Sequence, residues 1–366
     1  MADSMKPRFI IFNDNTIIEP AYASEARSRK RKRVDDVGES ELRRSNRYYD
    51  ERCPEACVLC VEKMLYRVEA TLLRRASERE DLVGGSDENP IILNNVEAGD
   101  FEELLWALKA SPAELEAPFE DKTQVRRLIS IASASCALQC TSLRKLAISR
   151  LRDVSSNEVL VDTDGLVLLV ELAIKHWEID LLNTVENVWM NRIRSSSSSS
   201  PLVIAILTTD RYHMRLPRLA GAAYYAYLQE LTTRHTSVSK YGATQIDMDP
   251  MLGPVQRARL LAGYWSLNSF WERLRRTPPW SVQCGHRDRC RSVWACRWHT
   301  SVVSLRVLSF CQTDVLGILS VVSDLLGADT GLGEGMFPMC RESALGHLQT
   351  IQCDLERDAV YHFAGV

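Results

Sequence analysis

The sequence lacks the motifs by which many enzymes are recognised. It has no Gly-x-Ser-x-Gly nucleophile elbow and no phosphate-binding loop that ends in Gly-Lys-Ser or Gly-Lys-Thr. Its seven histidines are scattered, and no two of them have the spacing of a metalloprotease motif. A nucleophile and its base can lie far apart in a sequence, so a catalytic site lacks support rather than being excluded. We therefore expect an interaction protein and not an enzyme.

The chain also lacks a long apolar run and an excess of positive charge. It has no N-terminal secretion signal, and its longest apolar stretches, Leu166–Ile174 and Val315–Leu326, are too short or too interrupted to span a bilayer. We therefore expect an intracellular protein, in the nucleus or the cytoplasm, that does not bind membranes. Its eleven cysteines are then expected to be free thiols. A net charge of −3 argues against nucleic-acid binding, because duplex binders usually carry a basic surplus.

The composition divides the 366 residues into five segments. Residues 1–55 are polar and are predicted to be largely disordered, although Pro7–Phe12 is apolar enough to add an edge strand. Residues 56–154 are predicted to form a mixed α/β module. A helical connector, 155–194, and a flexible six-serine linker, 195–200, follow. Residues 201–366 are predicted to be α-helical, with breaks around Thr236–Gly253 and Pro278–Cys284.

The mixed module begins with a strand pattern and continues with a helix pattern. Val58–Val61 and Met64–Val68 are typical of two strands, with a tight turn at Glu62-Lys63. Pro90–Leu93 is predicted to be a buried strand, and Asp100 is expected to cap the next helix. Apolar residues at helical spacing then predict three amphipathic helices. Their buried positions are Phe101, Leu104, Leu105 and Leu108, then Val125, Leu128, Ile129 and Ala132, then Leu143, Leu146, Ala147 and Leu151.

These segments resemble a BTB/POZ domain of the kind common among mushroom-forming fungi, the basidiomycetes. The run Cys60–Val68 looks like its first two strands, Gly85–Leu93 like its loop and third strand, and Asp100–Leu108 like the following helix. Leu216–Tyr225 and Leu260–Leu267 are similar to the helical segments that trail the domain in those proteins. The resemblance covers most of the chain after about residue 56. The chain departs from the family at residues 77–81, which are charged where the family usually has phenylalanines.

The resemblance implies an α+β BTB/POZ-like domain, a short mixed sheet covered by helices, followed by a mainly α-helical C-terminal region. Such a domain would self-associate as a homodimer or recruit a protein partner. One implied use is a substrate adaptor for a cullin-type ubiquitin ligase, in which the helices after Leu143 would meet the cullin scaffold. The alternative use is a nuclear regulatory scaffold.

A basic run is the direct hint of nuclear function. It consists of Arg29, Lys30, Arg31, Lys32 and Arg33. Short runs of this kind in disordered tails often act as nuclear import signals. There are two competing interpretations. One is a solvated charge run that no receptor recognises, and the other, less favoured, is a weak contact with phosphate groups.

A group of soft ligands near the C-terminal half suggests zinc. Cys284, His286, Cys290, Cys296 and His299 lie within sixteen residues. Zinc needs four such ligands, but these spacings match no standard finger, so we expect thiols without a metal and keep structural zinc as the alternative. A third functional hypothesis is therefore a zinc-dependent nucleic-acid binder. The pair Cys57 and Cys60 is not expected to chelate, because residues three apart in a strand point to opposite faces.

Two further patterns each have two interpretations. Arginines 287, 289, 291 and 297 are interleaved with Trp294 and Trp298, which either stack on bases or lie in the core with the arginines directed outward. The second pattern is a set of apolar residues at offsets of four and three, formed by Leu260, Tyr264, Leu267, Trp271 and Leu274. It predicts either a partner-binding helix or, preferably, the core-facing side of a bundle helix.

Overall fold

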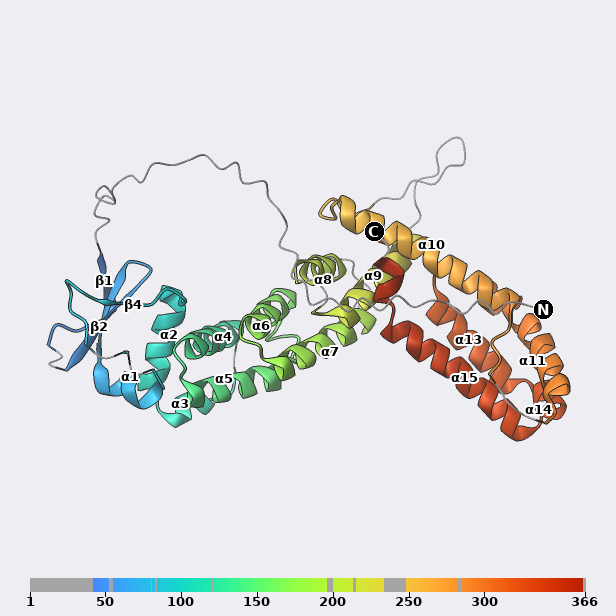
Figure 1. Ribbon diagram of the computed structural model, residues 1–366, viewed down its shortest axis with the longest axis horizontal. Helices are drawn as coiled ribbons and strands as arrows, with labels where there is room; N and C mark the ends of the chain where they lie inside the picture. The colour runs from blue at the N-terminus through green and yellow to red at the C-terminus, as the bar shows by residue number, and fades with distance from the viewer. Residues whose placement is uncertain are drawn as a thin grey trace, which may run out of the picture. The chain divides into compact units, whose positions relative to one another are not determined.

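A computed structural model describes residues 42–52, 55–79, 81–82, 84–119, 121–195, 200–212, 215–233, 248–281 and 285–364. Contacts join the chain from Arg43 onward into one unit. This unit begins with a small mixed sheet and continues with helices to its end (Figure 1). The predicted fold class, α+β followed by a mainly helical region, is confirmed at this level.

The sheet has four strands in the order β1-β3-β2-β4. Strands β2 (Ala56–Val61) and β3 (Met64–Glu69) are antiparallel, with Val61 paired to Met64. Glu62 and Lys63 join them with φ values of 48° and 69°, as a two-residue type I′ turn requires. The predicted hairpin is therefore confirmed. The edge strands β1 (Arg43–Tyr49) and β4 (Ile91–Ile92) run parallel to their neighbours.

The edge strands differ from the prediction in two places. Within the segment 1–55, which is predicted to be largely disordered, Arg43–Tyr49 forms β1 and pairs with β3. The sequence hides this strand because only Ser45 and Tyr48 are buried among its exposed basic residues. The predicted buried strand at Pro90–Leu93 is reduced to two residues, and Ile92 is exposed. Residues 1–41, with the apolar segment Pro7–Phe12 and the basic run, lie outside the described residues.

Helices α1 (Ala70–Ala76), α2 (Ala98–Lys109) and α4 (Lys122–Ala137) contribute buried residues to the core on one face of this sheet. The exposed short helix α3 (Pro112–Glu116) lies between α2 and α4 in the chain, and α5 (Thr141–Val154) packs against α4. The core between sheet and helices includes Leu59, Tyr66 and Phe101, all with no exposed surface, and the Tyr66 and Phe101 rings meet edge to face. Of the twelve predicted buried positions, Leu108, Ile129, Leu143 and Leu146 are half-buried and the other eight are buried.

The start of α2 differs from the prediction. Asp100 was expected to cap this helix, but the helix begins two residues earlier, at Ala98, and Asp100 lies in its first turn. The Glu62 carboxylate, from the hairpin turn, accepts a hydrogen bond from the backbone N–H of Ala98 at 3.1 Å. A group distant in sequence therefore satisfies an N–H at the helix start.

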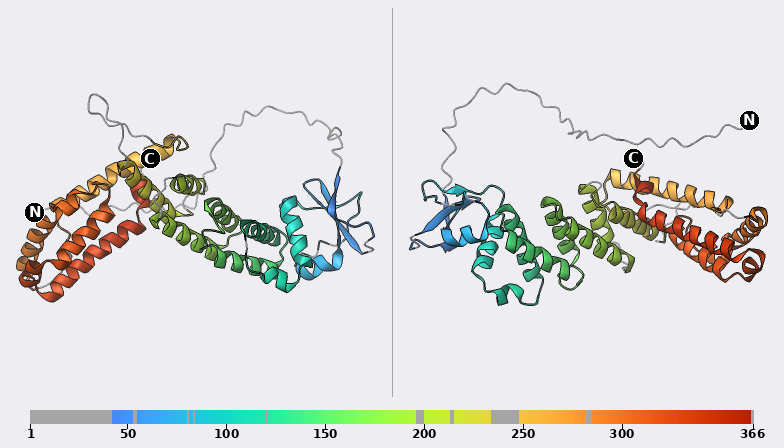
Figure 2. Two further views of the ribbon diagram at one scale, coloured as in Figure 1. Left: turned by 180° about the vertical axis from the view of Figure 1, so that it is seen from behind. Right: turned by 60° about the horizontal axis from the view of Figure 1, so that its bottom comes forward.

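The remaining helices continue the chain to its end, as the two further views show (Figure 2). They are α6 (Thr163–Lys175), α7 (Ile179–Ser195), α8 (Ser200–Arg211), α9 (Pro217–Thr233), α10 (Pro254–Arg276), α11 (Arg287–Val302), α12 (Leu305–Leu308), α13 (Val315–Ala328), α14 (Thr330–Gly335), α15 (Pro338–Arg357) and α16 (Val360–Phe363). In the part of the chain that the structure describes, none of the helices has the length and apolar character needed to cross a membrane.

The serine run separates two helices that share one core. Ser195 ends α7 and Ser200 begins α8, while residues 196–199 lie outside the described residues. Both helices contact α9, and buried residues from α5 to α16 belong to one hydrophobic cluster. Helices α6 and α7 occupy the segment predicted to be a helical connector, and most of the predicted breaks, residues 236–247 and 282–284, lie outside the described residues.

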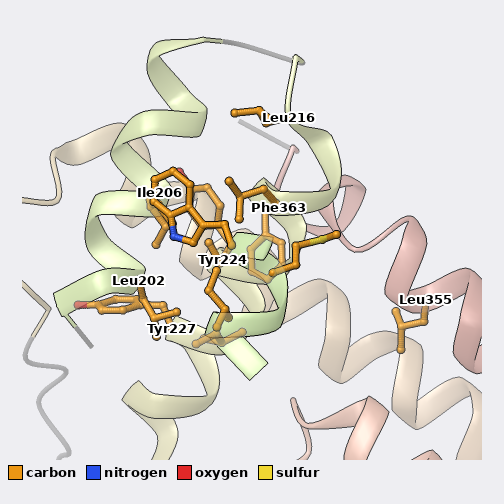
Figure 3. Packing of buried hydrophobic residues seen from close by; sticks show 14 of the residues in the cluster. Leu202, Ile206, Leu216, Tyr224, Tyr227, Leu355 and Phe363 are labelled. Carbon is orange, nitrogen blue, oxygen red and sulfur yellow. The ribbon is translucent and has the colours of Figure 1, made fainter. Parts of the chain in front are cut away.

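The short helix α16 packs between α9 and α10 (Figure 3). The Phe363 ring, 1% exposed, stacks on Tyr224 with centroids 5.4 Å apart. Gly263 of α10 leaves the space for this ring, because a Cβ atom at that position would overlap it. Helix α16 is thereby built into the core of the helical region.

Candidate functional site

The β4 edge is the first candidate site. Among the described residues, strand β4 pairs with β2 on one side and has no strand beside it on the other. Its Ile92 side chain is 65% exposed, whereas Leu93, the next residue, is buried and donates its N–H to the Cys60 carbonyl at 2.9 Å. An open strand edge with an exposed β-branched side chain is a template for pairing with another extended segment.

The loop before β4 fixes the position of this edge. Gly85 has a φ of +81°, and a Cβ atom there would lie 2.5 Å from the Val58 carbonyl oxygen, so the position requires glycine. Ser86 and Asn89 exchange backbone hydrogen bonds of 3.1 Å and close the loop. The exposed residue Ile92 therefore lies on a strand whose entry is constrained.

A groove of about 590 Å³ lies beside β4. Its floor includes Cys60, Leu93 and Val96, and its charged residues are Glu62, Lys63, Glu97 and Lys175. The charges are balanced, two of each sign, so the groove has no preference for an anion or a cation. Backbone pairing along β4 with an apolar side chain placed beside Ile92 is the chemistry that this arrangement allows.

The two cysteines of β2 lie on opposite faces of the sheet, as predicted. Cys57 packs in the core beneath the helices, and Cys60 packs with Val58 and Leu65 on the other face. Burial raises the pKa of the Cys57 thiol to about 11, so it stays protonated at neutral pH. Because the two thiols face opposite sides of the sheet, they do not share a metal ion, and each is part of the packing on its own side.

The candidate ligands of the alternative zinc site do not come together where the structure describes them. Cys290 is fully buried in α11, whereas Cys296 and His299 are exposed on the same helix. The His286 ring stacks on Phe337 with centroids 3.7 Å apart. Cys284 lies outside the described residues, and among the rest no group of three or more His, Cys, Asp or Glu side chains can share a metal ion.

Trp294 and Trp298 are core residues. Both are fully buried, and their indole N–H groups donate to the Pro279 and Leu274 carbonyls at 2.8 and 3.1 Å. Arg289 and Arg291 are exposed. The interpretation that the indoles lie in the core with arginines directed outward is confirmed for these residues, so base stacking on the two tryptophans has no basis.

The predicted apolar side of α10 faces the core at four of its five positions. Leu260, Leu267, Trp271 and Leu274 are buried, whereas Tyr264 is 45% exposed. The preferred interpretation, a core-facing side, is confirmed for the four. Sequence reasoning missed a second apolar face, on which Leu261 and Trp265 join Tyr264 in solvent. The spacing identifies the buried side of α10, but it gives no sign that Leu261, Tyr264 and Trp265 form an exposed apolar face beside it.

A serine–histidine contact also occurs on α10. Ser266 Oγ lies 2.8 Å from His362 Nδ1, and the Phe270 ring packs edge-on against the imidazole. Burial lowers the pKa of His362. A nucleophile–base pair is usually oriented by a third group, and among the described residues no carboxylate is hydrogen-bonded to this histidine. We interpret the contact as a tie between α10 and α16.

No family model matches the chain, and no curated protein and no solved structure is significantly similar to it. The functional argument therefore depends on this chain's own surfaces.

Proposed function

We propose that this chain is a protein-interaction protein in which residues 43–154 form a BTB/POZ-like module. The module pairs with a second copy or recruits a protein partner. In the second case the chain acts as a substrate adaptor, with the cullin scaffold of a ubiquitin ligase as one partner and its substrate as the other.

The open edge of β4 carries this proposal. Ile92 is 65% exposed there, beside a groove with an apolar floor, and isolated exposed edges of this kind favour pairing between chains. The order of elements also supports it, because a hairpin, a helix, a short strand and then helices is the order that the resemblance implies. The residues around the edge offer packing and backbone pairing and no reactive pair.

Light scattering after size exclusion of the full-length protein tests the proposal. We expect the mass of two chains, or a monomer that binds a purified cullin N-terminal domain. Ile92→Asp places a charge on the edge and should abolish whichever association is found. Val159→Asp is the matched control, because Val159 is also an exposed β-branched residue (77%) but lies outside the sheet. A wild-type monomer that binds no cullin would sink the proposal.

The two uses are separated by the same measurements. A dimer that does not bind the cullin domain supports self-association. Binding to the cullin domain that is lost in Ile92→Asp supports the adaptor. Association that survives in Ile92→Asp but not in Val159→Asp would place the interface elsewhere and remove the role of β4.

A nuclear regulatory scaffold is the second candidate function. The observation that favours it is the run of five cationic residues from Arg29 to Arg33. This run lies outside the described residues, so its support comes from sequence alone.

A further inference from the structure

Helix α10 has an exposed apolar face beside its buried one. Leu261, Tyr264 and Trp265 lie at offsets of zero, three and four, so their side chains are neighbours on the helix surface. They are 53%, 45% and 75% exposed, while Leu260 and Leu267 of the same helix lie in the core. A tryptophan beside a leucine and a tyrosine is the composition of the energetic centre of many protein interfaces.

Arginines lie at both ends of this apolar face. Arg257 lies one turn before Leu261, and Arg275 and Arg276 lie beyond it, all three exposed. Glu272 is the only acidic residue in the sequence of α10. Its carboxylate is shared by Arg275 at 2.9 Å and Arg276 at 3.3 Å, so one negative charge faces two positive ones.

Helix α11 packs against the end of α10 and carries further exposed arginines. Hydrogen bonds from its two buried indoles to the end of α10 and the residues that follow hold α11 against that end. Arg289 and Arg291 of α11 are exposed. Arg275 and Arg276 make the C-terminal end of α10 itself rich in arginine, and arginine is enriched in interfaces that bind carboxylates.

We propose that this surface binds an acidic protein segment that carries an apolar anchor. We call the surface the α10 ridge and define it by Leu261, Tyr264, Trp265, Arg257, Arg275 and Arg276. The anchor would pack on the three apolar side chains, and flanking carboxylates would pair with the arginines at each end. From residue 257 to residue 276 the ridge is roughly 28 Å long at 1.5 Å per residue, enough for a helix of about five turns.

Charge favours an acidic partner over a second copy of the chain. Two ridges placed together would bring six arginines against two glutamates, and like charges across an interface are unfavourable. The proposal goes beyond the proposed function, because the ridge shares no residue with the β4 edge. Each proposal can therefore fail while the other stands.

Selection from a library of random twelve-residue peptides on the full-length protein tests the proposal. We expect the enriched peptides to contain an excess of Asp and Glu around Leu, Phe or Trp. A labelled synthetic copy of the most enriched peptide should bind in fluorescence anisotropy, and its affinity should fall as salt is raised from 50 to 200 mM.

Two ridge variants test which side chains bind the peptide. In Leu261→Ser/Trp265→Ser, binding should be at least tenfold weaker. Arg275→Gln/Arg276→Gln should weaken it several-fold and remove most of the salt dependence.

Two control variants make the result specific. Leu305→Ser/Met339→Ser changes two other apolar side chains, 85% and 78% exposed, and should bind as the wild type does. Arg74→Gln/Arg75→Gln changes an exposed arginine pair at the end of α1 and should keep the salt dependence. Circular dichroism of each variant, and the single change Trp265→Ala, distinguish lost contacts from lost folding.

Four outcomes would overturn the proposal. They are the absence of any enriched peptide, enrichment of peptides without an acidic excess, wild-type binding by Leu261→Ser/Trp265→Ser, and losses in the control variants as large as those in the matching ridge variants. A dimer that Leu261→Ser/Trp265→Ser converts to a monomer would assign the ridge to a second copy. Binding to vesicles of anionic lipid that the same variant loses would assign it to a membrane surface.

Discussion

Glu186 shows how one buried side chain joins two helices. It lies on α7 and is 6% exposed, and its Oε1 accepts a hydrogen bond at 3.1 Å from the backbone N–H of Leu219, in the first turn of α9. Arg218 Nη1 lies 3.9 Å from its other oxygen. A carboxylate at a helix N-terminus satisfies an unpaired donor and interacts favourably with the helix dipole. Burial nevertheless disfavours the charged form and raises the pKa of Glu186 above its usual value.

This raised pKa predicts a defined pH dependence. Because the folded state holds the Glu186 proton more tightly than the unfolded state, the contribution to stability is fully present below the unfolded pKa of about 4.3. It is lost as the pH rises through the higher folded pKa. Glu186→Gln keeps an oxygen for the Leu219 N–H and removes the titration, so urea unfolding between pH 4 and 7 should lose this component.

Glu186→Ala separates the hydrogen bond from the charge. It leaves the Leu219 N–H without its partner in a buried place, and we expect about 1–3 kcal/mol less stability at neutral pH. If Glu186→Gln and Glu186→Ala unfold at the same urea concentration, the hydrogen bond contributes nothing measurable and this account of the α7–α9 contact is wrong.

At the scale of elements, the docking of α16 is a test of the helical core. Phe363→Ala removes a ring that is 1% exposed and stacked on Tyr224, and should lower the free energy of unfolding by about 3–5 kcal/mol. Tyr361→Ala is the matched control on the same short helix, because Tyr361 is 69% exposed and its loss should change stability by less than about 0.5 kcal/mol. Urea denaturation followed by circular dichroism measures both. Equal losses in the two variants would show that α16 frays and does not pack as described.

Elements set by local pattern were predictable, and those set by distant partners were not. The β2–β3 hairpin and the faces of α2, α4 and α5 follow from residue spacing within each segment. The strand Arg43–Tyr49 depends on pairing with β3, and the start of α2 depends on the Glu62 carboxylate. Nothing within these two segments encodes those contacts.

The candidate surfaces follow the same rule. Sheet order places β4 at an edge and so exposes Ile92, although its sequence, two isoleucines before a leucine, is typical of a buried strand. Trp265 is exposed because α10 turns its other side to α9 and α16. Sequence spacing shows which residues share an apolar face of a helix or strand. Tertiary packing decides whether that face is buried or exposed.

At the scale of the whole molecule, charge is distributed unevenly. The chain has a net charge of −3, yet five cationic residues are consecutive at 29–33. An import receptor recognises such a local run of positive charge and does not respond to the net charge of the chain. Nuclear import therefore depends on these five side chains if the nuclear proposal is correct.

Localisation of a tagged chain in cells checks this last prediction. The 41.5 kDa chain should carry a fusion large enough to prevent passive entry, and the wild type should then collect in the nucleus. Changing Arg29, Lys30, Arg31, Lys32 and Arg33 to Ala should leave it in the cytoplasm, because an import receptor reads positive charge at closely spaced positions. Arg→Lys changes at 29, 31 and 33 keep the charge and should keep import. A wild type retained in the cytoplasm, or unchanged import after all five Ala changes, would remove the basis of the nuclear scaffold and leave the β4 edge as the main support for function.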